Sequence, residues 1–298
     1  MLLVTGAGGQ VGRELVRAAA AGGHACQGFD RAQLDITDAD RVAQAVADHS
    51  TGNDVLINLA AFTSVDAAET DPDTAWRVNA HGVALLAAAC ARAGIPMIHV
   101  STDYVFPGST RALSEADPTG PLNEYGRSKL AGEHALREQQ PAHLVVRTSW
   151  VFGRGGRNFV PTMLRLAQER AEVAVVADEV GCPTAGTDLA ATLLELAVRA
   201  AAPGFGDWGT YHCCGRPAIS RADFARVIFE NARQAGLATA RVREITAAEF
   251  PSPARRPGRS VLDCSRLERV FGIRQPEWRP ALRTMLAALS AEAPHAGS

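Results

Sequence analysis

The first half of the chain alternates short apolar runs, rich in β-branched residues, with alanine-rich stretches of helical character. This alternation is typical of βαβ units wound around a parallel sheet. The apolar runs that we expect to form strands span residues 2–4, 25–29, 55–59, 97–100 and 144–147. The helices expected between them include residues 12–21 and 76–93. The pattern predicts an α/β fold with a doubly wound parallel sheet.

After about Trp150 the pattern changes to shorter and less regular pieces that are separated by prolines. We therefore expect a first domain over residues 1–150 and a smaller α/β domain that makes up most of residues 151–298. Some segments of the second half are expected to return to the first domain.

The composition excludes several classes of partner. Of the 298 residues 47% are hydrophobic, the formal net charge is -2, and no run of lysine or arginine occurs. Neither a nucleic-acid partner nor an anionic membrane partner is expected. The six cysteines include no CxxC pair and no ligand-like spacing with histidine, which argues against a zinc site and a disulfide framework. With neither a signal peptide nor an apolar run of membrane-spanning length in the sequence, we expect a cytoplasmic protein.

Three glycines follow the first expected strand and precede the first expected helix. They are Gly6, Gly9 and Gly12, and Gln10 and Val11 lie between the last two. A strand, a glycine-rich turn and a helix form the dinucleotide-binding fingerprint, in which the backbone approaches a pyrophosphate at the helix N-terminus. The simpler alternative is a turn that only joins strand to helix. The position directly after the first strand favours the cofactor loop of a Rossmann domain.

An acidic residue, Asp30, ends the second expected strand. A carboxylate there can accept hydrogen bonds from the ribose hydroxyls of a bound dinucleotide, although an aspartate at a strand end is also a common turn former. Arg31 follows it and is able to pair with a 2'-phosphate, so NADPH and NADH both stay open. The other residues expected to line the cofactor are Asp35, Ile36, Ala61, Phe62, Thr63 and Val100.

Tyr125 and Lys129 are four residues apart and therefore lie on one face of an expected helix. Reduction of a ketone by hydride leaves an alkoxide that needs a proton, and a tyrosine supplies it near neutral pH if a neighbouring positive charge lowers its pKa. In this interpretation Lys129 provides that charge and also binds the nicotinamide ribose. Taken alone, the spacing also fits a tyrosine that packs at a helix start with an exposed lysine one turn later.

Thr102 lies within Ser101-Thr102-Asp103 at the end of the fourth expected strand. Ligands of open α/β sheets bind at this carboxyl edge, so we expect the Thr102 hydroxyl to hydrogen-bond a substrate carbonyl. A capping or turn sequence is the alternative. The glycine loop, Thr102 and the Tyr125–Lys129 pair follow one another in the order of a hydride-transfer site, which favours a nicotinamide-dependent reductase.

Longer strings of the sequence resemble the dTDP-4-dehydrorhamnose reductase family, within the extended short-chain dehydrogenase/reductase superfamily. They are GQVG at 9–12, STDYVF at 101–106, PLN at 121–123 with the segment up to 129, RTSWV at 147–151, NF at 158–159, TMLRLA at 162–167, PT at 183–184 and PARRP at 253–257. STDYVF is the most specific of them. The resemblance implies that residues 1–150 bind NADPH or NADH and that residues 151–298 mainly bind the substrate.

The resemblance also implies an activity, the reduction of dTDP-4-dehydro-L-rhamnose to dTDP-L-rhamnose for bacterial cell-surface polysaccharide. Tyr125 would be the proton donor, and Thr102 with Asp103 would hold the sugar. Trp150 would pack against the sugar or its nucleotide, unless it is a core aromatic. Arg256 would bind the diphosphate, because arginine suits bidentate recognition of phosphate, unless it belongs to a solvated loop.

Some members of this family bind magnesium (Mg2+) through acidic groups at a dimer contact. Glu14 and Asp188 correspond to two of these positions, although a glutamate is expected where Asp188 stands and no third ligand can be identified. The resemblance likewise implies a homodimer. Both expectations rest on the resemblance alone.

Other functions on the same fold stay open. Nucleotide-sugar dehydratases resemble this pattern but carry an acidic pair after the threonine, whereas here Asp103 is followed by Tyr104. Another 4-keto nucleotide-sugar reductase or an epimerase is a second alternative. A third is a non-catalytic, NADP-binding regulatory subunit that resembles the β subunit of methionine adenosyltransferase. The presence of Thr102, Tyr125 and Lys129 together favours an enzyme.

Overall fold

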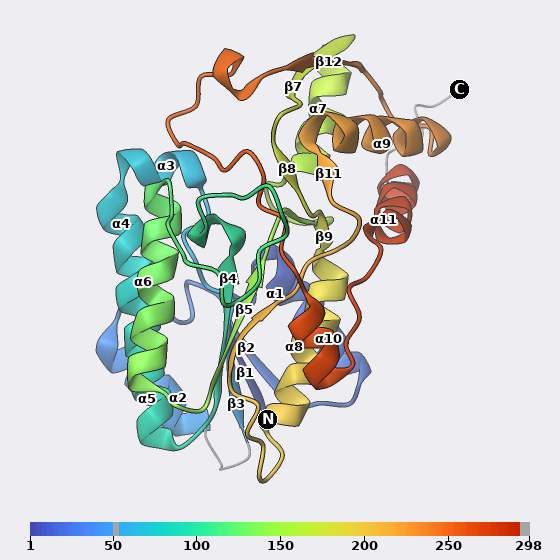
Figure 1. The fold of residues 1–298 in the computed structure, drawn as a ribbon. Helices are drawn as coiled ribbons and strands as arrows, with labels where there is room; N and C mark the ends of the chain where they lie inside the picture. The colour runs from blue at the N-terminus through green and yellow to red at the C-terminus, as the bar shows by residue number, and fades with distance from the viewer. Residues whose placement is uncertain (50–53, 293–298) are drawn as a thin grey trace.

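A six-stranded sheet forms the centre of the computed structural model, which describes residues 1–49 and 54–292 (Figure 1). The strand order is β10-β5-β4-β3-β1-β2, and every pair is parallel. The strands are β1 (Leu2–Thr5), β2 (Cys26–Phe29), β3 (Val55–Asn58), β4 (Met97–Thr102), β5 (His143–Thr148) and β10 (Gly209–His212). The five expected strands and the α/β fold are confirmed, and β10 joins the sheet from the second half of the chain.

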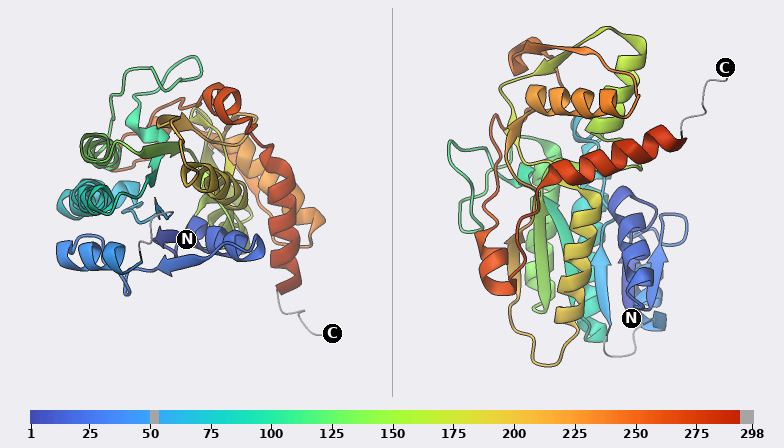
Figure 2. Two further views of the ribbon diagram at one scale, coloured as in Figure 1. Left: turned by 90° about the horizontal axis from the view of Figure 1, so that it is seen from below. Right: turned by 90° about the vertical axis from the view of Figure 1, so that its right-hand side faces the viewer.

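Helices cover both faces of the sheet, because successive strand residues point to opposite sides. One face carries α1 (Gln10–Ala21) and α8 (Gly186–Ala200), and the other carries α2 (Ala39–His49), α5 (Gly82–Ala93) and α6 (Glu124–Gln139) (Figure 2, left). Val4 packs into the core beneath α1 and α8, whereas its neighbour Leu3 packs into the core beneath α2 and α5. The sheet is therefore buried on both sides.

One expected helix contains a change of geometry. After α4 (Pro72–Trp76) the chain makes a π-helical turn at Arg77–His81 before α5 begins. This wider turn holds Asn79 in the interior, where its Nδ2 donates to Phe62 O and to Ser128 Oγ, each at 3.0 Å. Apolar periodicity predicts a helix here, but the i→i+5 hydrogen bonds of the turn depend on these tertiary contacts.

The second half of the chain adds a smaller layer beyond the carboxyl ends of the central strands (Figure 1; Figure 2, right). Its strands and helices are β6 (Val151–Phe152), α7 (Phe159–Glu169), β7 (Glu172–Val176), β8 (Val180–Gly181), β9 (Thr184–Ala185), β11 (Ile219–Ser220), α9 (Arg221–Gln234), β12 (Arg241–Ile245), a 3-10 helix (Ala247–Glu249) and α11 (Trp278–Glu292). The remaining helix, α10 (Ser265–Phe271), packs beside β10 in the core beneath α1 and α8. α7, β7, α9 and α11 enclose a separate core that includes Phe224 and Trp278.

Two short elements complete the fold, α3 (Val65–Thr70) and a 3-10 helix (Asp103–Val105) that follows β4 directly. Within residues 1–49 and 54–292, the structure contains no helix that is both long and apolar enough to span a membrane.

A buried ion pair ties α6 to the sheet. Arg147 of β5 donates to both carboxylate oxygens of Glu133, from Nε at 2.9 Å and from Nη2 at 2.7 Å. The same carboxylate accepts hydrogen bonds from Ser101 Oγ of β4 and from Arg137, each at 2.6 Å. Glu133 is 0% exposed and Arg147 is 3% exposed, so each charge depends on the other for compensation.

Removing one partner of this pair should destabilise the fold. Glu133→Ala leaves the Arg147 guanidinium buried and unpaired, and we expect the free energy of unfolding to fall by about 3–5 kcal/mol. Urea unfolding monitored by circular dichroism measures the change. Glu138→Gln, on the exposed side of the same helix, is the control and should change it by less than about 0.5 kcal/mol. Equal stability of the two variant proteins would contradict a stabilising role for the ion pair.

Candidate active site

The loop between β1 and α1 has the geometry that a bound anion requires. Gly6 has φ +70°, and a Cβ there would lie 2.6 Å from the Ala60 nitrogen, while a Cβ on Gly12 would lie 2.3 Å from Gly6 O. Only glycine fits either position. α1 begins after Gly9, which has no side chain to cap the helix, and the first turn of α1 contains no acidic residue. The N–H groups of this turn are therefore available to a pyrophosphate.

Gln10 connects this loop to the second half of the chain. Its Oε1 accepts a hydrogen bond from Asn158 Nδ2 at 3.0 Å, and a Cβ on Gly153 would lie 3.3 Å from Gln10 Nε2. That Nε2 is buried and has no hydrogen-bond partner in the part of the chain that the structure describes, which fits a ligand at the loop. The neighbouring Val11 packs against the core between α1 and the sheet.

Asp30 lies beside the glycine loop, since a Cβ on Gly8 would be 3.3 Å from Asp30 Cβ. Its Oδ1 accepts the backbone N–H groups of Ala32 and Gln33, each at 2.9 Å. The Asp30 carboxylate thus stabilises a turn, and it is also exposed next to the glycine loop. It therefore fits both roles expected from the sequence, the turn former and the acceptor for the ribose hydroxyls.

Arg31 and Asp35 lie at the surface, whereas Ile36 does not. The Arg31 side chain is 82% exposed, with its Nε 4.0 Å from an oxygen of Asp35. Hydrogen bonds from Thr37 hold the pKa of Asp35 below its usual range. Ile36 is buried and packs against Gly82 in the core, so only its backbone can reach a cofactor.

Ala61, Phe62 and Thr63 form part of the loop after β3. The side chain of Asn79 holds this loop, because it accepts the N–H of Phe62 at 2.9 Å and donates to the Phe62 carbonyl at 3.0 Å. Asn79 could not be predicted from the sequence, because its segment has the pattern of an ordinary helix and the π-helical turn leaves no separate signal.

Tyr125 lies in the first turn of α6, which Asn123 caps with its side chain. The ring of Tyr104 packs edge-to-face against it, with 5.8 Å between the centroids. Burial raises the pKa of Tyr125 above its usual value, and a hydrogen bond with Thr102 opposes this only in part. The sequence prediction that Lys129 lowers this pKa stays a prediction, and burial is the larger influence on Tyr125 in the structure.

Lys129 follows one helical turn later and is 2% exposed. Its Nζ donates to Val100 O at 2.7 Å and lies 3.1 Å from Nε2 of His99. Burial lowers the pKa of Lys129 to about 8, although the nearby Glu133 carboxylate acts in the opposite direction. The sequence analysis missed His99, and the one available signal was a histidine within an otherwise apolar strand.

Thr102 and Asp103 lie where β4 ends. Thr102 Oγ1 donates to Asp103 Oδ1 at 3.1 Å and accepts the N–H of Tyr104 at 3.2 Å. The other oxygen of Asp103 accepts a hydrogen bond from Ser260. Burial raises the pKa of Asp103 to about 6, against these hydrogen bonds. The fold thus brings Thr102 and Asp103 together with Tyr125, as the sequence predicted from separate motifs.

A cavity of about 1040 Å³ opens beside these residues, lined by both halves of the chain. Trp150 lines it in a left-handed backbone conformation, with φ 45°. Its indole packs on Gly181, where a Cβ would lie 2.4 Å from a ring atom, and the Arg221 guanidinium stacks 3.7 Å from its centroid. Such strained positions are concentrated at functional sites.

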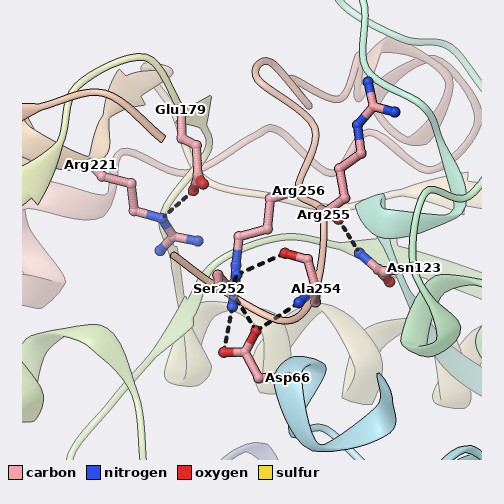
Figure 3. A network of polar contacts seen from close by, with 8 residues as sticks. All are labelled: Asp66, Asn123, Glu179, Arg221, Ser252, Ala254, Arg255 and Arg256. Carbon is pink, nitrogen blue, oxygen red and sulfur yellow. Dashed lines mark hydrogen bonds and ion pairs between the residues drawn. The ribbon is translucent and has the colours of Figure 1, made fainter. Parts of the chain in front are cut away.

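The proline-rich segment between β12 and α10 forms one wall of the cavity and is tied to the first half (Figure 3). Asp66 of α3 accepts hydrogen bonds from Ser252 Oγ at 2.7 Å and from Arg256 Nη2 at 2.8 Å. Asn123, the cap of α6, donates to Arg255 O at 2.8 Å. The wall therefore contacts the helix that carries Tyr125.

Four arginines line the cavity, Arg157, Arg221, Arg255 and Arg256, and two of them are paired with a carboxylate. Arg256, which the sequence predicted, contacts Asp66, and Arg221 lies 3.5 Å from Glu179 (Figure 3). The sequence analysis missed Arg221, Asp66 and Glu179, because nothing in their local sequence distinguishes them from surface charges.

The expected metal ligands lie on α1 and α8, two helices that pack together. Glu14 forms an ion pair with Arg17 at 2.6 Å, and burial raises the pKa of Asp188. No group of three or more His, Cys, Asp or Glu side chains in residues 1–49 and 54–292 could hold a metal ion. A magnesium site that Glu14 and Asp188 share with a second copy at a dimer contact stays a prediction.

Comparisons with known proteins agree with this geometry. The model of the family described as "RmlD substrate binding domain" matches residues 1–291. A dTDP-4-dehydrorhamnose reductase from Sinorhizobium fredii is 42% identical over 293 residues, covering 98% of each chain. The chain belongs to the dTDP-4-dehydrorhamnose reductase family.

Solved structures of dTDP-4-dehydrorhamnose reductases have the same fold. The enzyme from Clostridium acetobutylicum has a TM-score of 0.89 at 36% identity, with 97% of this chain and 99% of that chain covered. The enzyme from Bacillus anthracis, in complex with NADP, has a TM-score of 0.88 at 35% identity, with 96% and 98% covered. Membership of the dTDP-4-dehydrorhamnose reductase family thus extends through both halves of the chain.

Proposed function

We propose that the protein reduces the 4-keto group of dTDP-4-dehydro-L-rhamnose to give dTDP-L-rhamnose, with hydride from NADPH or NADH. The observation that carries this proposal is the convergence of Thr102, Asp103 and Tyr125 beside a cavity lined by Trp150 and Arg256. Family membership over nearly the whole chain supports the substrate class. The NADP complex of the Bacillus anthracis relative supports the cofactor class.

The cofactor would lie along the carboxyl edge of the sheet. The N–H groups at the start of α1 would bind its pyrophosphate, and Asp30 would accept hydrogen bonds from the adenosine ribose. The exposed Arg31 is able to pair with a 2'-phosphate, which supports NADPH alongside NADH. Lys129 and the Val100 carbonyl would hold the nicotinamide end. When bound, the cofactor supplies the hydride that reduces the substrate carbonyl.

Tyr125 supplies the proton in this mechanism. As hydride adds to the carbonyl carbon, the π electron pair of the C=O bond moves to oxygen, and the Tyr125 O–H proton moves to that oxygen to form the alcohol. Burial raises the pKa of Tyr125, so its hydroxyl carries a proton at neutral pH, and the positive charge of Lys129 would favour release of that proton. Thr102 would donate its hydroxyl hydrogen to the same oxygen and orient it, in place of the bond that it makes to Asp103.

The nucleotide would occupy the cavity between the two halves. Arg256 and Arg221 both line it and offer guanidinium groups that match a diphosphate. The Arg221 guanidinium stacks over the Trp150 indole, and the two side chains together would contact the sugar or its nucleotide. Asp66 holds Arg256 in place.

The family resemblance also supports a homodimer that works in the cytoplasm, and we include both in the proposal. Light scattering after size-exclusion chromatography measures the mass in solution. A mass of about twice 31.4 kDa is expected.

The activity is tested by loss of 340 nm absorbance from NADPH and from NADH, with purified protein and dTDP-4-dehydro-L-rhamnose generated in the assay. We expect oxidation that requires the sugar, and the two rates rank the cofactors. Cofactor binding without any oxidation would overturn the proposal in favour of a regulatory subunit or a different 4-keto sugar.

Tyr125→Phe should lower kcat by about 100- to 10,000-fold, because it removes the proton donor but keeps the ring. Cofactor affinity should stay the same, as measured by quenching of protein fluorescence. Tyr211→Phe is the matched control, since Tyr211 is a buried tyrosine whose hydroxyl bonds to Asp207 O. Turnover by Tyr125→Phe at the wild-type rate would reject Tyr125 as the acid.

Gly9→Asp should weaken cofactor binding by about 100-fold or more, because a carboxylate would face the pyrophosphate and occupy the N–H groups of α1. The fold should tolerate it, since Gly9 has φ -73° and aspartate is a favoured N-cap residue. Gly9→Ala adds the same Cβ without the charge and is the control. Equal NADPH titrations of Gly9→Asp and the wild type would contradict the loop assignment.

A further inference from the structure

A row of buried polar side chains runs beneath the Tyr125–Lys129 pair. Asn58 Oδ1 accepts the hydroxyl of Thr5 at 2.7 Å and the backbone N–H of Ala60 at 3.0 Å. Asn58 Nδ2 lies 3.0 Å from His99 Nδ1, and His99 Nε2 lies 3.1 Å from Lys129 Nζ. Asn58 and His99 are both 0% exposed, so protein groups must satisfy their hydrogen bonds.

The hydrogen bonds around Asn58 determine the tautomer of His99. The backbone N–H of Ala60 can only donate, so the Asn58 atom that it contacts must be the amide oxygen. The amide nitrogen therefore faces His99 Nδ1 and donates to it, which places the ring proton on Nε2. Burial, together with the charge of Lys129, lowers the pKa of His99 well below its usual value, so the ring carries one proton.

The Nε2–H of His99 faces the amine of Lys129. A neutral amine has a lone pair that accepts this hydrogen, whereas an ammonium has none and would oppose one donor with another. The bond from Nζ to Val100 O uses one N–H of the neutral amine, which has a second N–H as well. The Glu133 carboxylate, although it is paired with Arg147, favours the ammonium, so the neutral amine predominates above the Lys129 pKa of about 8.

The composition of the chain also indicates that a side chain able to become neutral is needed at position 129. Lys129 is the only lysine in the sequence, in which arginine provides all 29 other members of the 30 Lys and Arg residues. An arginine cannot lose its proton in a protein, whereas a buried lysine can. The single lysine of the sequence thus lies opposite a hydrogen-bond donor.

We propose that His99 is a positioning residue for Lys129. Asn58 sets the tautomer of His99, which donates Nε2–H to Lys129 when the amine is neutral. When Lys129 becomes protonated, His99 directs Nζ toward Tyr125. The inference rests on the proposed function only for its catalytic consequence. A protonated Lys129 is repelled by the His99 N–H and so turns toward Tyr125 and the nicotinamide ribose. The direction in which the Lys129 side chain points would thereby depend on whether its amine is charged.

The tautomer of His99 tests the proposal in the wild-type protein, without any substitution. Nitrogen NMR of protein labelled with 15N-histidine distinguishes a protonated from an unprotonated ring nitrogen, and the signal missing from His99→Gln identifies His99. We expect a proton on Nε2 and none on Nδ1 across neutral pH. A proton on Nδ1, or on both nitrogens, would overturn the proposal.

The titration of Lys129 tests the link to Asn58. In protein labelled with 13C-lysine the single lysine gives one side-chain signal, whose pH dependence reports its protonation. In Asn58→Asp a carboxylate accepts from His99 Nδ1–H, so Nε2 becomes an acceptor that favours the ammonium. We expect the midpoint to rise by about one to three pH units.

His143→Gln is the control, because His143 is also a buried histidine but bonds to Gln140 O at the opposite end of the sheet. It should leave the Lys129 midpoint where it is in the wild type. An unchanged midpoint in folded Asn58→Asp would overturn the proposal. Neither NMR measurement needs substrate, so a protein that gives both expected results without any turnover would contradict the proposed function and support the role of His99.

Discussion

The placement of α6 depends on the buried ion pair between Glu133 and Arg147. The pair joins the helix to β5, and the hydrogen bond from Ser101 to the same carboxylate joins it to β4. Lys129 and Tyr125 lie one and two turns before Glu133 on the same helix, so this anchor also fixes their distance from the end of β4. An error of one helical turn in this docking would separate Tyr125 from Thr102.

Around this anchor, polar contacts at the carboxyl edge of the sheet join the two halves of the chain. Gln10 bonds to Asn158, Asp66 holds Arg256, and Asp103 bonds to Ser260. Each contact joins residues more than 100 positions apart. The groups that join the two halves at the cavity therefore also contact the glycine loop, Arg256 and the segment that contains Thr102.

The local patterns predicted much of the fold and the centre of the site. Apolar runs bounded by small residues indicated the first five strands, because strands buried on both faces are apolar throughout. The glycine loop and the Tyr125–Lys129 spacing depend only on neighbours in sequence, so they could also be recognised. Asn79 and His99 could not, since their roles arise from partners on other elements.

The sequence by itself determined the class of fold, the order of the motifs and the family, because these follow from short-range spacing and apolar periodicity. Only the tertiary structure decided the protonation chemistry. Burial raises the pKa of Tyr125, where sequence reasoning expected a lysine to lower it, and burial also lowers the pKa of Lys129. The physical reason is that desolvation depends on the packing of residues that are distant along the chain, and spacing within one helix does not encode it.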